Sequence, residues 1–231
     1  MSRWSIADVM TVGVVSVEEG TPFKEIVDLM EAHHVNAVPV VDSCDRVLGV
    51  VSSADLVPKI EFSGSGDHAH LFESRKHRAA REKSTGTAAA ELMTAPAQTV
   101  LPQTSLVEAA KLMETAELKR LPVVNDLGRL VGIVTRSDLL KVYLRSDTDL
   151  RREIVDEVLV DIPGLDRELV RVTVDDGVVT LEGEVDRRSV ITAAVRHVER
   201  VAGVVDVISD LSYRHDDLVE PPAHLHAPVT Y

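Results

Sequence analysis

The sequence predicts an α/β protein in which two copies of a β-α-β-β-α unit precede a small α+β domain with the element order α-β-β-α-β. Two observations predict this: an internal repeat in the first 145 residues, and an unrelated valine-rich segment that begins near Asp149. The chain has 231 residues, of which 45% are hydrophobic and 3% aromatic, so its cores must be aliphatic. This length is typical of one or two ordinary domains.

The repeat aligns residues 10–57 with residues 93–140 without a gap. Glycines, prolines and acids stay in register across the two copies. The matched positions include Met10-Thr11 with Met93-Thr94, Pro39 with Pro122, Gly49 with Gly132, and Asp55-Leu56 with Asp138-Leu139. Chance does not preserve such a register, so the sequence predicts two similar structural units.

Each copy is expected to contain a strand, a helix, a hairpin and a second helix. In the first copy, we expect Thr21 to cap the helix and Pro22 to occupy its first position. Two apolar β-branched runs follow, at residues 37–41 and 47–51, and a polar turn separates them. This pattern predicts a hairpin that is buried on both faces.

The second helix of each copy begins with the same motif, Gly-x-x-Ser/Thr-x-x-Asp, with helix starts at Ser52 and Thr135. One interpretation is a capping box, in which the hydroxyl binds a free backbone N–H of the first turn. In the other interpretation, the Ser or Thr hydroxyl and the backbone N–H groups of the first helical turn bind a phosphate. The Asp carboxylate three residues later then accepts hydrogen bonds from both hydroxyls of a ribose. The glycine would then let a ligand approach the backbone.

The repeated pattern resembles a pair of CBS domains, also called a Bateman module, over residues 6–60 and 89–145. The resemblance rests on Met-Thr at the start of each copy, Pro-Val-Val in the middle, and Gly-Val-Val-Ser-Ser-Ala-Asp or Gly-Ile-Val-Thr-Arg-Ser-Asp at the end. It implies a module with pseudo-two-fold symmetry, a homodimer formed through the paired domains, and clefts that bind adenosyl compounds. The ligands that it implies are AMP, ADP, ATP, NAD and S-adenosylmethionine, held as regulators rather than as required cofactors.

In this family the Ser or Thr of the motif contacts phosphate and the Asp contacts ribose. The ligand-binding residues implied here are Ser52 and Asp55 in one cleft and Thr135 and Asp138 in the other. The resemblance further implies that the clefts are lined by the segments just after each Met-Thr pair and by those before two prolines, which comprise Asn36, Ala37 and Val38 and Lys119, Arg120 and Leu121. Arg136 is expected to help hold a phosphate, whereas its counterpart in the first copy is Ser53. We therefore expect unequal clefts and favour the one that contains Thr135 and Arg136.

Residues 61–88, between the copies, differ in composition from the rest of the chain. A Gly/Ser-rich stretch at 63–67 is typical of a flexible linker, and a basic run from Arg75 to Lys83 follows it. The alternatives for this run are a phosphate-binding arm, a contact for an acidic partner and a solvated connector. Histidine pairs at 68–70 and 224–226 lack a third ligand, so we predict no metal site.

The last third forms a separate unit. An apolar helix stripe ends at Pro163-Gly164, and alternating valines lead to a hairpin turn at residues 175–177. A helix over residues 187–202 and a third strand at 205–208 complete the predicted order.

This unit resembles a BON domain over residues 147–213, through the glycine-centred stretches 177–185 and 201–207. The resemblance implies association with phospholipid, with envelope components or with other proteins. Acidic residues outnumber arginines in this unit and it has no lysine, so we favour a protein partner over membrane lipid. Residues 214–231 are expected to form a disordered tail.

Composition narrows the function further. The chain has 25 Lys+Arg against 38 Asp+Glu, a net charge of −13, which argues against bulk nucleic acid as a partner. No secretory signal or membrane-spanning stretch is visible, and Cys44 is the single cysteine, so we expect a cytoplasmic protein. No motif for nucleophilic, metal-dependent or glycine-rich-loop catalysis appears, and we predict no enzyme activity.

We therefore expect a non-catalytic sensor of adenine nucleotides whose BON domain contacts an unidentified protein partner. The alternative is a dimeric scaffold, or an envelope- or phospholipid-associated protein, with vestigial nucleotide clefts.

Overall fold

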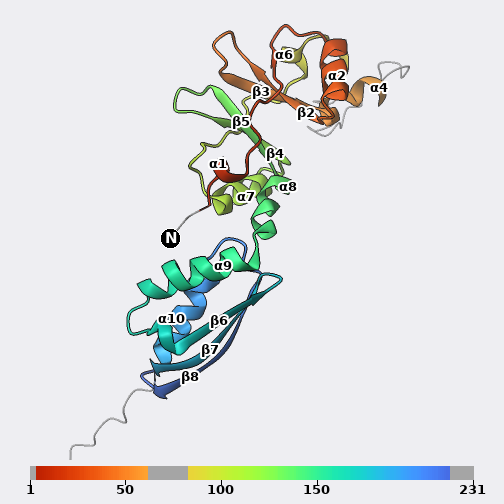
Figure 1. Cartoon of the computed structure of the whole chain (residues 1–231). Coiled ribbons are helices and arrows are strands. Elements are labelled where there is room, and N and C mark those ends of the chain that lie inside the picture. The colour runs from red at the N-terminus through yellow and green to blue at the C-terminus, as the bar shows by residue number, and fades with distance from the viewer. Residues whose placement is uncertain (1–3, 62–82, 219–231) are drawn as a thin grey trace, which may run out of the picture. The chain divides into compact units, whose positions relative to one another are not determined.

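The computed structural model describes residues 4–61 and 83–218, and its internal contacts divide the chain into two units (Figure 1). One unit spans Trp4–Leu139 and the other begins at Leu140, and each is described by itself. The Gly/Ser-rich stretch, the basic run up to Arg81 and both histidine pairs lie outside the described residues.

In the first unit, each copy of the repeat contains a helix, an antiparallel hairpin and a second helix, as predicted. The first copy comprises α1 (Ile6–Val9), β1 (Val17–Glu18), α2 (Phe23–Ala32), β2 (Ala37–Val41), β3 (Val47–Ser52), α3 (Ser53–Leu56) and α4 (Pro58–Glu61). The second copy comprises α6 (Ala89–Leu92), α7 (Leu106–Thr115), β4 (Arg120–Val124), β5 (Leu130–Thr135) and α8 (Arg136–Leu139).

Two local details differ from the expectation. Helix α2 begins one residue late, with Pro22 at the N-cap, because the backbone of Pro22 is extended at ψ 151°. The hydroxyl of Thr21 accepts a hydrogen bond from the N–H of Glu18 at 3.1 Å and does not cap the helix.

The first strand also differs between the copies. In the first copy β1 pairs in parallel with β2, whereas in the second copy the equivalent pairing is a single bridge between Val100 and Val123.

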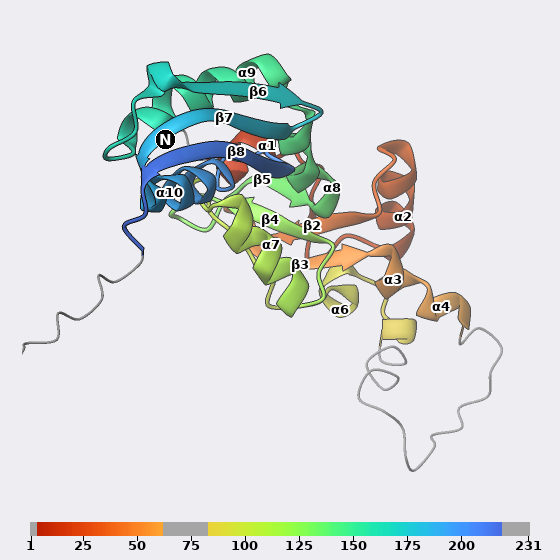
Figure 2. The ribbon, with the colours of Figure 1, turned by 90° about the horizontal axis from the view of Figure 1, so that it is seen from below.

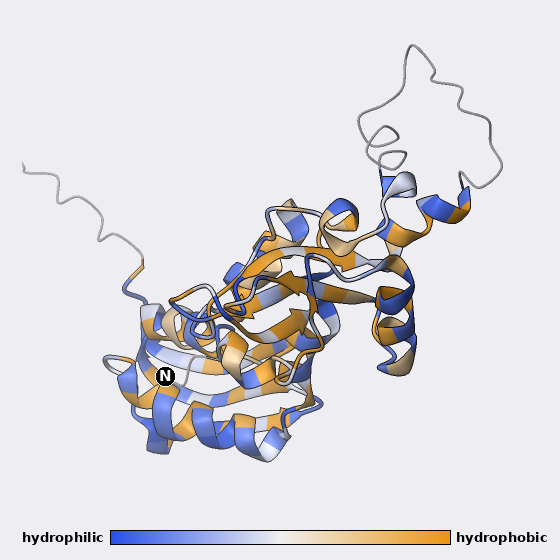
Figure 3. Cartoon of the chain, turned by 90° about the horizontal axis from the view of Figure 1, so that it is seen from above, coloured by the Kyte–Doolittle hydropathy of each residue, from blue (hydrophilic) through white to orange (hydrophobic). Residues whose placement is uncertain are grey.

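The two copies exchange their first helices. Ile6 and Val9 of α1 pack into the core of the second copy, whereas Ala89 and Leu92 of α6 pack into the core of the first. Apolar residues concentrate on the hairpin strands between these helices (Figure 3). Because each core needs a helix from the other copy, neither copy buries its apolar surface alone.

The chain segments that follow the exchanged helices pair with the hairpins of the opposite copy. Thr94 exchanges two backbone hydrogen bonds with Val50, at 2.9 and 3.1 Å. A Cβ atom at Gly49 would lie 2.5 Å from the Sδ atom of Met93, and one at Gly132 would lie 2.7 Å from that of Met10. These glycines therefore make room for the other copy's chain.

The second unit has the predicted α+β order, with a three-stranded sheet in the strand order β6-β7-β8 (Figure 2). Strands β6 and β7 are antiparallel, and β8 runs parallel to β7. The elements are η1 (Leu140–Leu144), α9 (Asp147–Glu153), η2 (Ile154–Val158), η3 (Leu159–Asp161), η4 (Arg167–Leu169), β6 (Val170–Asp175), β7 (Val178–Arg187), α10 (Arg188–Val198) and β8 (Asp206–His215). Their valines, leucines and isoleucines form one core between the sheet and the helices.

This unit extends further along the chain than the sequence indicated. Strand β8 continues to His215, well beyond the expected third strand and into the expected tail. The carboxylate of Asp217 accepts the backbone N–H of Ser189 at 2.9 Å, at the start of α10. Residues 214–217 therefore belong to the folded unit.

Candidate functional site

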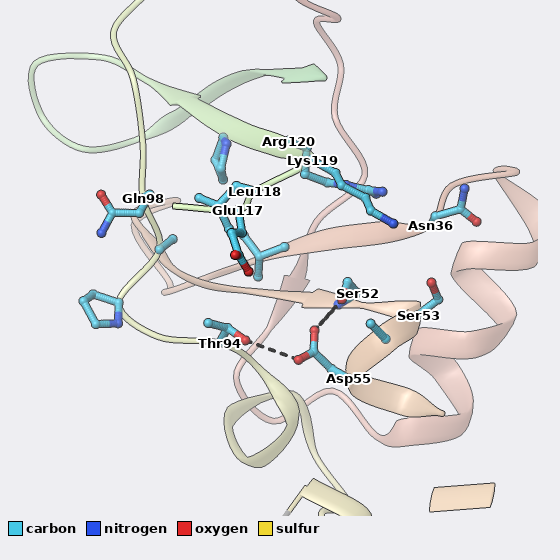
Figure 4. Close-up of a pocket in the computed structure, with 15 residues that line it drawn as sticks. Asn36, Ser52, Ser53, Asp55, Thr94, Gln98, Glu117, Leu118, Lys119 and Arg120 are labelled. Atoms are coloured by element: carbon cyan, nitrogen blue, oxygen red, sulfur yellow. Dashed lines mark hydrogen bonds between the residues drawn. The ribbon is translucent and has the colours of Figure 1, made fainter. Parts of the chain in front are cut away.

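A cavity of about 450 Å³ lies between the two copies of the repeat, where the start of α3 faces the segment that leads into β4 (Figure 4). The residues that line it come from both copies. They are Asn36, Val50, Ser52, Ser53, Ala54, Asp55, Thr94, Pro96, Ala97, Gln98, Glu117, Leu118, Lys119, Arg120 and Pro122. This volume is within the range of small-molecule sites.

The Asp55 carboxylate is the centre of a hydrogen-bond network on one wall of the cavity. Its Oδ2 atom accepts the backbone N–H and the hydroxyl of Ser52, at 2.8 and 2.6 Å. Its Oδ1 atom accepts the hydroxyl of Thr94 at 3.2 Å and forms an ion pair with the ammonium group of Lys83. The Ser52 contacts cap α3, so the capping role and a position in the cavity wall are combined in one side chain.

Arg120 and Lys119 supply positive charge on the opposite wall, and both extend toward the side of the cavity where Asn36 lies (Figure 4). Arg120 is half-buried, and this burial lowers the pKa of its guanidinium from the ordinary value. Among residues 4–61 and 83–218, no group accepts a hydrogen bond from this guanidinium. A desolvated cation without a partner is costly, and an anionic ligand would remove that cost.

The register of each hairpin brings the start of its first strand next to the helix that follows its second strand. Ala37 pairs with Ser52 in the first copy and Arg120 pairs with Thr135 in the second, so the residue that precedes each hairpin lies beside a helix start. The backbone N–H of Ser53 accordingly donates to the carbonyl of Asn36 at 3.0 Å. Asn36 and the helix start therefore form a continuous wall.

Residues of the second motif form several hydrogen bonds within their own copy. The backbone N–H and hydroxyl of Thr135 donate to Asp138 at 2.8 and 2.7 Å, and the N–H of Asp138 donates to the Thr135 hydroxyl at 3.2 Å. The Arg136 guanidinium donates to the carbonyls of Leu118 at 2.9 Å and Met113 at 3.1 Å. These three motif residues are not in the lining of the cavity, which lies at the first motif rather than at the motif that the sequence favoured.

The other expected residues divide into two groups. Lys119 and Arg120 line the cavity, whereas Ala37, Val38 and Leu121 are buried in strands and do not. Thr94 and Lys83 were not predicted from the sequence as partners of Asp55. Thr94 was detectable, because it belongs to the Met-Thr pair that recurs in both copies. The contact of Lys83 has no sequence pattern, because 28 positions separate it from Asp55.

The described part of the chain was predicted to hold neither a membrane-spanning segment nor a metal site. No helix there is long and apolar enough to cross a membrane. Within residues 4–61 and 83–218, no group of three or more His, Cys, Asp or Glu side chains is arranged to hold a metal ion.

Comparison with known proteins gives the family. The CBS domain model matches residues 6–61 and 89–145, and the BON domain model matches residues 146–215. The CBS domain-containing protein CBSX1, chloroplastic, of Arabidopsis thaliana is 30% identical over 138 residues, which are 56% of this chain and 58% of that protein. A homoserine O-acetyltransferase of Methanocorpusculum labreanum is 30% identical over 139 residues, 60% of this chain but only 24% of the enzyme. The chain thus spans less than two thirds of the length of either relative.

A solved structure agrees with these matches. The crystal structure of CBSX2 in complex with AMP superimposes with a TM-score of 0.53 at 30% sequence identity, over 61% of this chain and 97% of that one. The fold therefore agrees with the family that the motifs indicated. The chain belongs to the CBS domain family, with a pair of CBS domains followed by a BON domain.

Proposed function

We propose that the cavity between the two CBS domains binds an adenine nucleotide, and that the protein is a non-catalytic sensor of this ligand. One observation carries the proposal: the cavity combines the carboxylate of Asp55 with the guanidinium of Arg120, to which no described residue is hydrogen-bonded. Both are needed to hold a nucleotide, since ribose hydroxyls donate to carboxylates and phosphates accept from guanidinium groups. The complex of the related CBSX2 with AMP supports an adenosyl ligand.

In the proposed complex, Asp55 accepts the ribose hydroxyls, and Arg120 and Lys119 hold the phosphate. Ser52 stands at the start of α3, where its hydroxyl also faces the cavity. The ligand thereby connects groups from both copies of the repeat. Binding would stabilise the arrangement in which the two walls lie close together over one in which they lie further apart. The size of this effect equals the difference in binding free energy of the ligand between the two arrangements. The homodimer through the CBS pair, which the resemblance implies, belongs to the same proposal.

Substitutions of the two motif aspartates test this assignment. Asp55→Asn is expected to weaken AMP binding by about tenfold or more, the equivalent of about 1.4 kcal/mol. The matched variant Asp138→Asn alters the same kind of helix cap and should bind AMP as the wild type does. Isothermal titration calorimetry with AMP, ATP, NAD and S-adenosylmethionine measures both. The proposal fails if none of the four ligands binds the wild type, or if Asp138→Asn alone loses affinity.

For the BON unit we propose the role of a protein-interaction module. The acidic balance of this unit supports a protein partner, because anionic lipid would repel it. Sedimentation of the full chain with anionic phospholipid vesicles at physiological salt is the test. The protein is expected to remain in the supernatant, as in a control with uncharged vesicles. Pelleting with the anionic vesicles alone would contradict the protein-interaction role and favour lipid binding.

A further inference from the structure

We infer that Lys83, in the segment between the two CBS domains, is a built-in competitor of the nucleotide, because it occupies the carboxylate that the ribose must reach. This inference rests on the proposed nucleotide function and adds a regulatory element to the same site. It depends on three features of the structure: the saturation of Asp55, the fixed position of its other partners, and the anchoring of the segment that carries Lys83.

Asp55 has no free acceptor position. A carboxylate offers about four lone-pair positions. Two are used on Oδ2 by the N–H and hydroxyl of Ser52, and two on Oδ1 by the Thr94 hydroxyl and the Lys83 ammonium. A ribose that donates to Asp55 must therefore replace at least one of these donors.

Lys83 is the donor that can leave. Ser52 belongs to the same helix turn as Asp55, and its contacts cap that helix. Thr94 is held in place by its backbone pairing with Val50. The Lys83 ammonium, in contrast, is at the end of a long flexible side chain from a different segment. Its withdrawal breaks the ion pair and its hydrogen bond to the Thr94 hydroxyl at 2.9 Å, without disturbing a helix or a strand.

The segment that carries Lys83 is attached to the first CBS domain. The Lys59 ammonium on α4 donates to the carbonyl of Gly86 at 2.6 Å and lies 4.9 Å from the centre of the Phe23 ring. The backbone N–H of Gly86 donates to the carbonyl of Lys83 at 3.1 Å. This attachment keeps the Lys83 ammonium next to the cavity, so it competes as a local group and not as a freely diffusing cation.

The ion pair is strong enough to matter for binding. The side chains of Lys83 and Asp55 are only 19% and 15% exposed, so water screens the pair less than it screens a surface salt bridge. For a ligand that binds only the form in which the ion pair is open, the intrinsic affinity is multiplied by the fraction of molecules in that form. The penalty should be largest for a nucleoside, because a phosphate can still attract the released ammonium, together with Arg120 and Lys119.

Adenosine and AMP titrations distinguish this inference from the proposed function. Lys83→Met is expected to bind adenosine about tenfold more tightly than the wild type, whereas Lys83→Arg, which keeps the charge, should bind it as the wild type does. Lys111→Met, on the exposed face of α7 and outside the cavity lining, is the control for a general change in charge and should have no effect. Thermal denaturation checks that each variant is folded.

Two results overturn the inference. If Lys83→Met binds adenosine no more tightly than the wild type while AMP still binds, Lys83 is not a competitor and the nucleotide function stands. If neither protein binds adenosine or AMP, the proposed function fails and the competition fails with it.

Discussion

Replacing Arg120 by methionine is expected to weaken AMP binding about hundredfold without lowering the free energy of unfolding. The guanidinium is half-buried, and no described residue accepts a hydrogen bond from it. In the free protein it is a partly desolvated charge that donates no hydrogen bond to a described residue, and methionine keeps an apolar side chain of similar length, so removal of the charge should leave stability unchanged or raise it. In the complex it binds the phosphate, and hydrogen bonds to charged groups contribute about 1.5–3 kcal/mol, which corresponds to roughly a tenfold to hundredfold change in affinity.

Two arginine variants serve as controls. Arg129→Met removes the same charge from an exposed position outside the cavity lining and should alter neither affinity nor stability strongly. Arg136→Met should lower stability, because it removes the donors to Leu118 and Met113, while AMP affinity stays within a few-fold of the wild type. Calorimetric titration and thermal denaturation give both quantities. If Arg136→Met loses as much affinity as Arg120→Met, or if Arg120→Met binds AMP normally, the phosphate is not held where we propose.

The second large effect is expected at Gly183, where alanine should destabilise the BON unit by about 3 kcal/mol or more. Gly183 has φ +137°, a conformation that only glycine adopts readily. An added Cβ would also collide with the backbone carbonyl oxygen of Leu169. Gly183 pairs with Val170 on one side and Leu211 on the other, so both neighbouring strands restrain its backbone. The collision cannot be relieved without disturbing the sheet.

Gly164→Ala is the matched control in the same unit. Gly164 has φ +81°, but an added Cβ would meet only the Cγ2 atom of Val190, at an ordinary 3.6 Å. This variant should cost about 1 kcal/mol, from backbone strain alone. Differential scanning calorimetry with and without AMP measures the losses and indicates which transition the ligand stabilises. Equal stability of Gly183→Ala and Gly164→Ala would contradict the prediction, as would a loss of AMP binding in Gly183→Ala under conditions where it remains folded.

Much of the fold was predictable because its signals are local. The repeated Gly-x-x-Ser/Thr-x-x-Asp motif identified the helix starts at Ser52 and Thr135, since a capping box involves residues only three positions apart. The hairpins follow from apolar runs around polar turns, and the order of the BON unit follows from its alternating valines and glycine turns. Register in such hairpins is specified by side chains that must point into a core.

The sequence favoured the second motif as the candidate site, whereas the cavity described above lies at the first. The sequence marks Asp55 and Asp138 as equivalent, and the arginine after Thr135 made the second motif the more attractive phosphate site. In the folded protein Arg136 donates to the carbonyls of Met113 and Leu118, whereas Arg120 lines the cavity and has no such partner among residues 4–61 and 83–218. The partners of a charged side chain in the folded protein decide how much a ligand gains by contacting it. That depends on neighbours that are distant in the sequence.

By itself, the sequence determined the duplication, the elements of each copy, the capped helix starts and the separate C-terminal unit, because each is encoded by spacing within a few tens of residues. Only the tertiary structure decided that the copies exchange their first helices, that Thr94 and Lys83 reach Asp55, and that the cavity lies at the first motif. The physical reason is that burial and pairing depend on which segments share a core. No local pattern specifies that the Lys83 ammonium meets a carboxylate 28 positions away.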